Sequence, residues 1–467
     1  MPKSDSPSGL PALLGGSPVR TRPFSSKPFI DEREVDAVAQ TVRDGLLSRF
    51  VGSPMPGTRD QLRRTSAELL GLDEPFSFLG GPNVRRFEAA WACAHGAPYA
   101  VAMNSATSAE TSALMALGIG PGAEVITTPL SFTATATAIV AANATPIFAD
   151  IDPETMCLNP SSVEAAISPR TACILPVHWC GNAGEFIEIL EVARRHDLPV
   201  LEDSAQAPGS MYKGRFLGTW GDAATFSFSE PKNVTTGEGG MVLTSNVEIA
   251  EKCRLIRNHG EAIPTADDDE DFVVNVVGQN FRMTEATAAL GWVQTSKLQE
   301  VNTIRNRNHL HLVDRLEEVA GSYLAPQRLT HPETFAGYTS AFRWLEAESD
   351  VPRDVIAVAL RAEGIPVATG VGRLMSDNEL FRRRIAYGRQ HYPFGDHVEY
   401  RPESLPNAHR LHDREYLAFF LAGWPNTTRD MDDIASAFEK IVAHLDDLAH
   451  YAREHEREAP AFDRGRG

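Results

Sequence analysis

The sequence predicts an α/β protein built on a mostly parallel sheet. From Pro98 to Leu201, short apolar runs typical of strands alternate with longer segments that have the apolar spacing of helices. Repeated strand–helix units of this length place helices on both faces of a parallel sheet. With 467 residues the chain is long enough for a large core, and two domains are expected.

The expected strands of this alternation are short and apolar: Tyr99–Met103, Glu124–Thr128, Pro146–Ala149, Ala172–Val177 and Pro199–Leu201. The segments between them have one apolar face and are expected to be helices: Ser108–Leu117, Ala134–Ala142, Ser161–Ile167 and Glu185–Arg195. Two more strands are expected, at Ala223–Phe228 and Gly240–Thr244. Ligands of such sheets bind at the carboxyl ends of the strands. The residues that follow strands are therefore expected on one rim: Asn104, Pro129, His178 and Asp203.

Composition changes along the chain predict the domain organisation. Residues 1–28 are polar and rich in Pro, Ser and Gly and are expected to be a disordered tail, as are residues 456–467. A large domain is expected over 29–300 and a smaller one over 301–455. The periodic segments outside the alternation are expected to be helices: Asp31–Gly45, Thr284–Leu298, Arg353–Glu363 and Asp430–Arg453.

Charge and cysteine content exclude several classes of protein. The formal net charge is −18, whereas unassisted nucleic-acid binding needs a basic surface. The five cysteines have no CxxC or Cys/His spacing of a metal site, and an odd, sparse set is typical of reduced thiols in the cytoplasm. No run has the apolar length of a membrane helix, and the N-terminus does not resemble a signal peptide.

One lysine and one aspartate have the placement that pyridoxal phosphate (PLP) requires. Lys232 follows the strand expected at Ala223–Phe228 and precedes the glycine-rich turn at residues 237–240, while Asp203 ends an apolar run. The aldehyde of PLP needs an amine to form a Schiff base, and its pyridine nitrogen needs a carboxylate to stay protonated. Taken singly, a loop lysine is more often solvated and a strand-end aspartate is more often a turn residue.

Five ordered motifs strengthen this interpretation. They are Asn104-Ser-Ala-Thr-Ser-Ala, Glu202-Asp-Ser-Ala-Gln-Ala-Pro-Gly, the string Ser227–Gly240, Arg257-Asn-His-Gly and Gly278-Gln-Asn-Phe-Arg-Met. Together they resemble the DegT/StrS family of PLP-dependent sugar aminotransferases, and the resemblance runs from about Phe29 to about Leu445. It implies a fold-type I PLP-dependent transferase, in which a large, mostly parallel domain carries a smaller α+β C-terminal domain.

The resemblance also implies which residues contact the cofactor ring. Lys232 would form the Schiff base and move protons, and Asp203 would hold the pyridinium nitrogen. Phe132 would stack on the ring, although a phenylalanine in this position is otherwise more often part of the core. Gln206 would contact the ring oxygen or the ring face.

Phosphate binding is expected at the start of a helix. Ser105-Ala-Thr-Ser-Ala opens a helix after a strand, so its backbone N–H groups would face an anion, although a plain helix cap has the same sequence. The family pattern implies that Ala106, Thr107 and Ser227 bind the phosphate. It assigns a further contact to Asn280 of a neighbouring subunit, which implies a homodimer with shared active sites.

The common reaction of the family moves an amino group from glutamate or glutamine to a keto sugar, usually nucleotide-linked, or to a keto-cyclitol. The segments Gly364–Gly370 and Asn378–Phe381 are closer to the aminocyclitol or antibiotic-sugar branch. Dehydratases of the superfamily replace the lysine with histidine, so Lys232 favours amino transfer. The alternatives are another PLP reaction, such as dehydration or carbon–carbon bond formation, and a regulatory or scaffold homologue without catalysis.

Residues 50–80 form a longer connection than the common family members have here. A helix is expected over Arg59–Leu70, and Phe76, Phe78 and Leu79 are expected to form an exposed apolar patch. Exposed apolar patches usually mark an interface. The insert is therefore expected to cap the mouth of the active site or to extend the dimer contact, unless it is only a surface embellishment.

Overall fold

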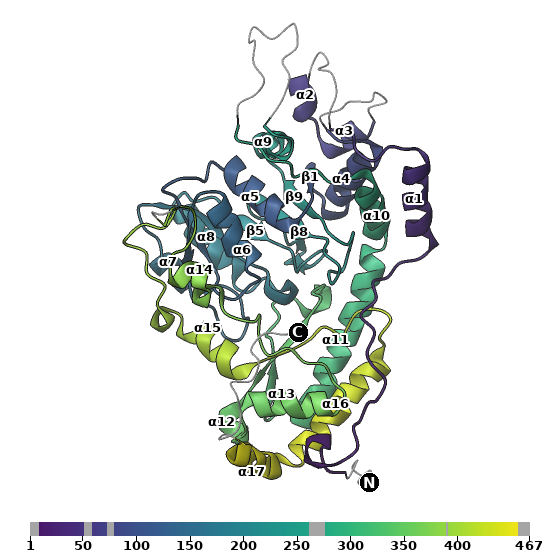
Figure 1. Cartoon of the computed structure of the whole chain (residues 1–467), viewed down its shortest axis with the longest axis vertical. Coiled ribbons are helices and arrows are strands. Elements are labelled where there is room, and N and C mark those ends of the chain that lie inside the picture. The colour runs from purple at the N-terminus through teal and green to yellow at the C-terminus, as the bar shows by residue number, and fades with distance from the viewer. Residues whose placement is uncertain (1–8, 51–57, 72–78, 261–275, 389–390, 456–467) are drawn as a thin grey trace.

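The computed structural model describes residues 9–50, 58–71, 79–260, 276–388 and 391–455. Figure 1 shows two parts, one around the strands β1, β5, β8 and β9 and the other around the helices α13, α16 and α17. The long helix α11 (Leu298–Ala320) runs from one part to the other. Each part has a hydrophobic core of its own. The expected domain boundary at residue 300 falls in the first turn of α11.

The mostly parallel sheet that the sequence predicts is present. Its strands are β1 (Tyr99–Met103), β2 (Glu124–Thr127), β3 (Thr145–Phe148), β4 (Thr171–Leu175), β5 (Leu201–Asp203), β8 (Ala223–Ser227) and β9 (Gly240–Thr244). They pair in the orders β3-β2-β4 and β1-β9-β8-β5, and parallel bridges from Ile174 to Val200 and from Val177 to Asp203 link β4 to β5. Strand β9 runs antiparallel to both of its neighbours. The carboxyl ends of β1, β5 and β8 consequently lie at one edge.

Helices cover both faces of this sheet because its strands are apolar on both faces. They are α4 (Pro82–His95), α5 (Ala106–Ala116), α6 (Ala134–Ala141), α7 (Pro160–Ala165), α8 (Phe186–Arg195), α9 (Val247–Arg257) and α10 (Glu285–Ser296). A short hairpin, β6 (Met211–Tyr212) and β7 (Arg215–Phe216), follows β5. Helix α5 is buried along most of its length, since it packs between the sheet and the helices α6 and α9.

The C-terminal part is built on an antiparallel sheet of β10 (Leu324–Pro326), β11 (Ser340–Trp344) and β12 (Tyr416–Phe419). Its helices are α11, α12 (Glu346–Ser349), α13 (Arg353–Ala362), α16 (Thr428–Val442) and α17 (Leu445–His455). The single final helix expected over Asp430–Arg453 is wrong, because the chain turns at residues 443–444. The turn lets Leu448 of α17 reach the core that α16 also faces.

Residues 375–388 and 391–410 lie against the first part of the molecule, although the sequence placed them in the C-terminal domain. They contain η4 (Met375–Asp377), α14 (Glu379–Arg382), η5 (Pro402–Ser404) and α15 (Pro406–Arg410). Phe381 and Phe394 pack with Ala136 and Val140 of α6. Tyr400 donates a hydrogen bond of 2.8 Å to the carbonyl oxygen of Pro146. Figure 1 accordingly shows α14 beside α6 and α7. Composition alone does not indicate which core such a connection joins.

The N-terminal segment differs from the expected disordered tail over residues 9–28. It contains the short helix η1 (Ala12–Leu14), and its apolar side chains pack on the C-terminal core: Leu13, Leu14, Val19 and Phe24. The buried carboxylate of Glu363 accepts backbone hydrogen bonds from Ala12 (2.7 Å) and Val19 (2.9 Å). Four apolar residues scattered among prolines and glycines gave no periodic signal from which this docking could be predicted.

The insert at residues 50–80 is described only in part. The helix expected over Arg59–Leu70 is two short helices, α2 (Thr58–Leu62) and α3 (Ser66–Leu70), because Thr65 caps a new helix. Leu79 is fully buried, which corrects its expected place in an exposed patch. Phe76 and Phe78 lie outside the described residues.

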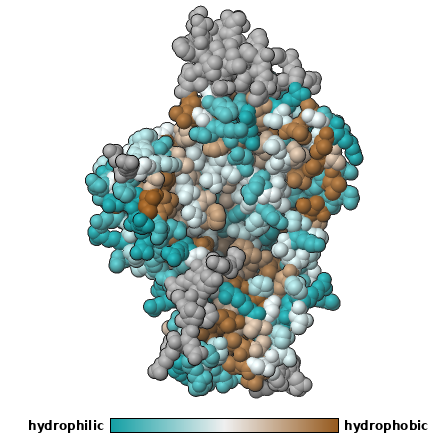
Figure 2. Space-filling model, in the orientation of Figure 1, coloured by the Kyte–Doolittle hydropathy of each residue, from teal (hydrophilic) through white to brown (hydrophobic). Residues whose placement is uncertain are grey.

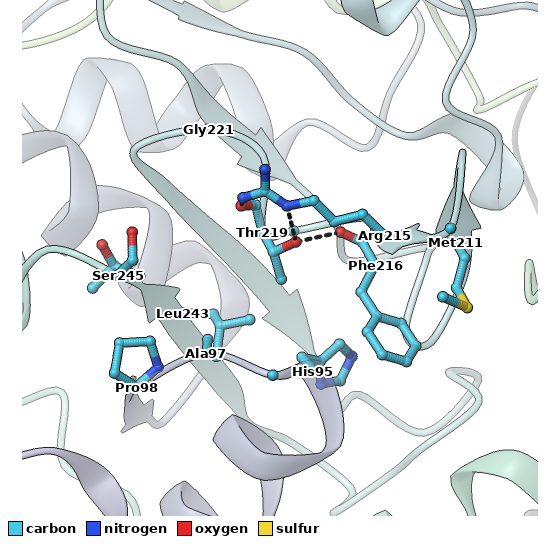
Figure 3. A pocket seen from close by; sticks show the side chains of 14 residues that line it. His95, Ala97, Pro98, Met211, Arg215, Phe216, Thr219, Gly221, Leu243 and Ser245 are labelled. Atoms are coloured by element: carbon cyan, nitrogen blue, oxygen red, sulfur yellow. Dashed lines mark hydrogen bonds between the residues drawn. The ribbon is translucent and has the colours of Figure 1, made fainter.

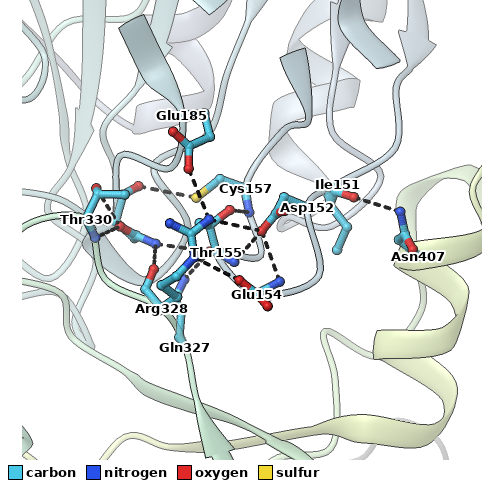
Figure 4. A network of polar contacts seen from close by, with 11 residues as sticks. Ile151, Asp152, Glu154, Thr155, Cys157, Glu185, Gln327, Arg328, Thr330 and Asn407 are labelled. Atoms are coloured by element: carbon cyan, nitrogen blue, oxygen red, sulfur yellow. Dashed lines mark hydrogen bonds and ion pairs between the residues drawn. The ribbon is translucent and has the colours of Figure 1, made fainter. Parts of the chain in front are cut away.

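A polar network joins the two parts of the molecule (Figure 4). Arg328, which follows β10, forms ion pairs of 3.0 Å with Glu154 and with Glu185. Asn182 donates a hydrogen bond of 3.0 Å to the carbonyl oxygen of Arg328. Gln327 donates one of 3.2 Å to the carbonyl oxygen of Trp179. The loop after β4 is thereby tied to the C-terminal part.

Apolar side chains are exposed near α1 (Glu32–Arg43): Val35 and Val42 are 53% and 59% exposed, and Leu47 is 55% exposed. Figure 2 shows apolar surface on the side of the molecule where Figure 1 places α1 and α10. Among the described residues, no helix combines the length and the apolar character needed to cross a membrane.

Candidate active site

The edge formed by the carboxyl ends of β1, β5 and β8 gathers the residues that the motifs singled out. Asp203 is the last residue of β5, and Ser227 is the last residue of β8. Asp203 pairs in register with Thr225, so Ser227 lies two residues further along the same edge. Strand β1 ends at Met103 and leads directly into α5. The sheet topology thus brings the end of β1 together with the ends of β5 and β8, which follow it by 100 residues or more in the chain.

The amino terminus of α5 presents backbone donors at this edge. Ser105 caps the helix, with a hydrogen bond of 3.1 Å from the backbone N–H of Ser108 to its side chain. Ala106 and Thr107 are the first two helical residues, so their N–H groups have no partner within the helix. These groups and the helix dipole attract an anion. Gly240 is required here, because a Cβ atom would lie 2.2 Å from the carbonyl oxygen of Ser105.

Asp203 is buried and held in one orientation. Its side chain is 4% exposed. Its Oδ1 accepts a hydrogen bond of 3.0 Å from the backbone N–H of Ala205, and its Oδ2 accepts one of 2.9 Å from the hydroxyl group of Thr135. That hydroxyl group also lies 3.0 Å from the Oγ of Ser131. Sequence reasoning missed Thr135, because nothing distinguishes it from the other threonines at 133 and 137.

Lys232 lies on the loop that follows β8 and is half-buried. Its backbone N–H donates to the carbonyl oxygen of Ser229 (3.0 Å), which shapes the turn. Its Nζ lies 4.3 Å from the centre of the Tyr338 ring, a cation–π contact with the C-terminal part. Tyr338 was not found from the sequence, since no motif connects it to Lys232. The hydroxyl groups of Ser227 and Ser229, which precede Lys232 in the chain, lie 3.3 Å apart.

The charges of Lys232 and Asp203 converge on one buried group, the carboxyl group of Glu110 in α5. Burial and the neighbouring Asp203 raise the pKa of Glu110 well above its usual value, and the positive charge of Lys232 opposes this rise. Both side chains therefore lie near the same carboxyl group. This edge therefore combines a cation, an anion and the backbone donors of a helix amino terminus.

Gln206 and Cys180 line the adjoining loop. The Oε1 of Gln206 accepts a hydrogen bond of 2.9 Å from the backbone N–H of Cys180. Burial raises the pKa of the Cys180 thiol to about 12, although the hydrogen bond with Tyr416 and the charge of Lys232 lower it. A thiol with so high a pKa is not a nucleophile near neutral pH. His178 is buried and lies 2.8 Å from the carboxylate of Glu202, so it has a partner of its own.

Phe132 and Asn280 are exposed in the single chain. Phe132 is 74% exposed, so it is not part of the core. The Oδ1 of Asn280 accepts a hydrogen bond of 2.8 Å from Arg282, and its carbonyl oxygen lies 3.4 Å from the amide nitrogen of Asn104. Asn280 therefore lies close to the residue that precedes the α5 amino terminus.

A separate pocket of about 240 Å³ lies at the opposite edge of the sheet (Figure 3). Its lining includes Pro98 before β1, Gly221 before β8 and Ser245 after β9. These positions mark the ends of the strands that are remote from Asp203 and Ser227. Since ligands of α/β sheets bind at the carboxyl ends of the strands, this pocket is not part of the candidate active site.

Comparison with known proteins gives one consistent family. Residues 66–417 match the model of the DegT/DnrJ/EryC1/StrS aminotransferase family. The chain is 33% identical over 455 residues to the L-glutamine:2-deoxy-scyllo-inosose aminotransferase of Streptoalloteichus tenebrarius, an alignment that covers 94% of this chain and 98% of the relative. It is 43% identical over 227 residues to the GDP-perosamine synthase of Caulobacter vibrioides, covering 49% of this chain and 60% of the relative.

The structure agrees with this assignment. It superposes on DesI, solved in the presence of its TDP-sugar product, with a TM-score of 0.74 at 27% identity, covering 95% of this chain and 99% of DesI. The expected α/β fold of a fold-type I transferase is thereby confirmed. The family resemblance drawn from the five motifs is confirmed as well. The chain belongs to the DegT/DnrJ/EryC1/StrS aminotransferase family and is an aminotransferase.

Proposed function

We propose that the protein is a PLP-dependent aminotransferase that moves an amino group from glutamine or glutamate to a keto-cyclitol. The observation that carries this proposal is the placement of Lys232 and Asp203 around one sheet edge, beside the amino terminus of α5. Bound PLP would supply an aldehyde that links to amines and a protonated ring that accepts an electron pair. The donors and acceptors at this edge fit such a cofactor.

Each part of the cofactor has matching groups in the chain. The Asp203 carboxylate would accept a hydrogen bond from the protonated ring nitrogen. The N–H groups of Ala106 and Thr107 and the hydroxyl group of Ser227 would bind the phosphate. The exposed ring of Phe132 is free to stack on the cofactor ring, and Gln206 would contact that ring from the neighbouring loop. These roles follow the family pattern, and the geometry described above supports them.

Lys232 would do most of the proton transfer. Its amine would be the group that attaches the aldehyde of the cofactor, and it would be free whenever a substrate amine held that position. The free Nζ would move a proton between the amine-bearing carbon of the substrate and the cofactor. The Tyr338 ring, 4.3 Å from Nζ, would hold the ammonium form of the side chain between these transfers. Loss of the lysine therefore removes both the attachment point and the proton carrier.

The extent of the similarity favours a keto-cyclitol as the acceptor. The similarity to the inosose aminotransferase extends over 94% of the chain. The similarity to GDP-perosamine synthase covers 49% of the chain, although the identity there is higher. A nucleotide-linked keto sugar is the second candidate, supported by that identity and by the likeness to DesI with its TDP-sugar product.

We also propose a homodimer with shared active sites, in which Asn280 of the partner subunit contacts the phosphate. Two exposed apolar residues support an interface, since Val277, three residues before Asn280, and Phe132 are each 74% exposed. The five cysteines are unpaired, which supports a reducing compartment such as the cytoplasm.

The test of the proposed function follows the amino nitrogen. The full-length protein is loaded with PLP and given α-¹⁵N-glutamine or ¹⁵N-glutamate, with either a keto-inosose or a nucleotide-linked keto sugar as acceptor. Mass spectrometry should find ¹⁵N in the cyclitol product. Lys232→Ala should abolish this transfer, whereas the exposed control Lys213→Ala should retain it. A wild-type protein that holds PLP but labels none of the acceptors would refute the proposal.

A further inference from the structure

A buried acid lies directly behind Asp203. Glu110 belongs to α5, and its side chain is 2% exposed. Asp203 and Thr225 are the neighbouring side chains that act on the pKa of its carboxyl group. Thr225 is the register partner of Asp203 across β5 and β8. Helix α5 therefore contributes to the site twice, with its amino terminus at the phosphate end and with Glu110 beneath the carboxylate.

Two carboxyl groups in contact in a buried place do not both ionise. Burial is the largest cause of a shift in the pKa of Glu110. Burial, the charge of Asp203 and the hydrogen bond with Asp203 together raise this pKa well above its usual value. The positive charge of Lys232 and the hydroxyl group of Thr225 act in the opposite direction without cancelling the rise. A shift in this direction favours the protonated form of Glu110.

The hydrogen-bond partners of the Glu110 carboxyl group favour the same state. The Oε2 of Glu110 is buried and has no hydrogen-bond partner among the described groups, and the same holds for the Oγ1 of Thr225. A carboxylate only accepts hydrogen bonds, so two ionised groups leave their contact without a donor. A proton on Glu110 supplies that donor, and Asp203 supplies the acceptor.

Asp203 has room for this bond. Its carboxylate offers about four lone-pair sites. The backbone N–H of Ala205 uses one site, and the hydroxyl group of Thr135 uses another. A hydrogen bond from Glu110 would fill a third, which leaves one site for a ring nitrogen.

We propose that Glu110 is a positioning residue: it keeps its proton, donates a hydrogen bond to Asp203 and orients that carboxylate toward bound PLP. The proposal rests on the proposed function and adds a residue that the motifs did not single out. Glu110 and Asp203 would then carry a single negative charge between them. It also makes the orientation of Asp203 depend on α5, the helix that binds the phosphate.

Infrared difference spectroscopy on the cofactor-free, full-length protein tests the proton itself. Wild-type protein at pH 7 should show the carbonyl stretch of a protonated carboxyl group, and Glu110→Gln should lose it. Glu124→Gln is the matched control. Burial tends to raise the pKa of Glu124, but hydrogen bonds from Ser168, Arg170 and His397 outweigh it and lower the pKa. This control should therefore keep the band, while Asp203→Asn should shift it.

PLP affinity, measured by equilibrium dialysis, tests the positioning role. Glu110→Gln keeps the size and an N–H donor, so its dissociation constant should stay within about threefold of wild type. Glu110→Leu has no donor and should bind PLP about tenfold more weakly. A wild-type spectrum without the band, or with a band that survives Glu110→Gln, overturns the proposal. Unchanged affinity in a folded Glu110→Leu protein overturns the positioning role. Failure of the wild type to bind PLP instead refutes the proposed function, while the band still reports the proton.

Discussion

The hydroxyl group of Thr135 donates a hydrogen bond of 2.9 Å to the Oδ2 of Asp203. Thr135 lies near the start of α6, whereas Asp203 ends β5, so the contact links a helix on one face of the sheet to the edge of the sheet. Because both side chains are buried, water does not replace this bond when the hydroxyl group is removed. The orientation of the carboxylate that faces the proposed cofactor therefore depends on α6.

Thr135→Val should weaken PLP binding without unfolding the protein. The substitution keeps the shape of the side chain and removes one donor to a charged acceptor, which is worth roughly 1.5–3 kcal/mol. We expect the dissociation constant for PLP, measured by absorbance titration, to rise by about one to two orders of magnitude. Thr137→Val is the control, since Thr137 donates to the carbonyl oxygen of Thr133 within the same helix region. Equal affinities in the two variants would contradict the role of Thr135.

A mixture of Lys232→Ala and Asn280→Ala proteins should recover activity if Asn280 acts across the dimer. After subunit exchange, a heterodimer would have one site with both defects and one site with neither. We expect transferase activity to rise above that of either variant alone, up to about half of the wild-type activity per heterodimer. Sedimentation and a tagged-subunit pull-down would establish the exchange. If exchange is complete and activity stays absent, or if the protein is a monomer, the shared site is wrong.

Acid should destabilise the protein through His309. Burial lowers the pKa of His309 from 6.5 to about 4, and its Nδ1 lies 2.8 Å from the hydroxyl group of Ser340. The unfolded chain binds a proton below pH 6.5, whereas the folded protein does not until about pH 4. Stability is therefore full above pH 6.5 and falls on acidification, by about 1.4 kcal/mol per pH unit for this group.

Urea denaturation between pH 4.5 and 7.5 measures this effect. His309→Gln removes the titrating group, so its free energy of unfolding should fall less steeply with acidification than that of wild type. His450→Gln is the control, because the His450 side chain is 66% exposed. The assignment would be wrong if His309→Gln and His450→Gln followed the same pH profile.

Glu363→Ala should release the N-terminal segment and destabilise the C-terminal part. Glu363 is fully buried and lies 3.0 Å from the Nζ of Lys440, and it also accepts the backbone hydrogen bonds of Ala12 and Val19. Its loss leaves the buried Lys440 without its counter-charge, which costs roughly 3 kcal/mol. We expect a lower urea midpoint and faster proteolysis within residues 9–28. The exposed Glu348→Ala should change neither, and a resistant Glu363→Ala segment would contradict the docking.

Local patterns in the sequence were enough to predict most of the central sheet. Strands β1 and β9 begin and end at the expected residues, Tyr99–Met103 and Gly240–Thr244. Turn residues bound the apolar run of each strand. The apolar pattern and the turn signals therefore both depend on only a few neighbouring residues. The final helix was harder to predict. Its apolar spacing continues past residues 443–444, and the turn there depends on where Leu448 finds its core.

The sequence by itself determined the family through short ordered motifs and the parallel sheet through the alternation of strand and helix segments, and it singled out Lys232 and Asp203 as the candidate pair. Only the tertiary structure revealed Thr135, Glu110 and Tyr338 beside that pair. They come from α6, α5 and the C-terminal part, and no periodicity links them to the motif residues. The docking of residues 9–28 on the C-terminal core was invisible for the same reason. A motif identifies functional residues that are neighbours in the sequence. Which side chains are buried beside a charged group depends instead on how distant elements pack.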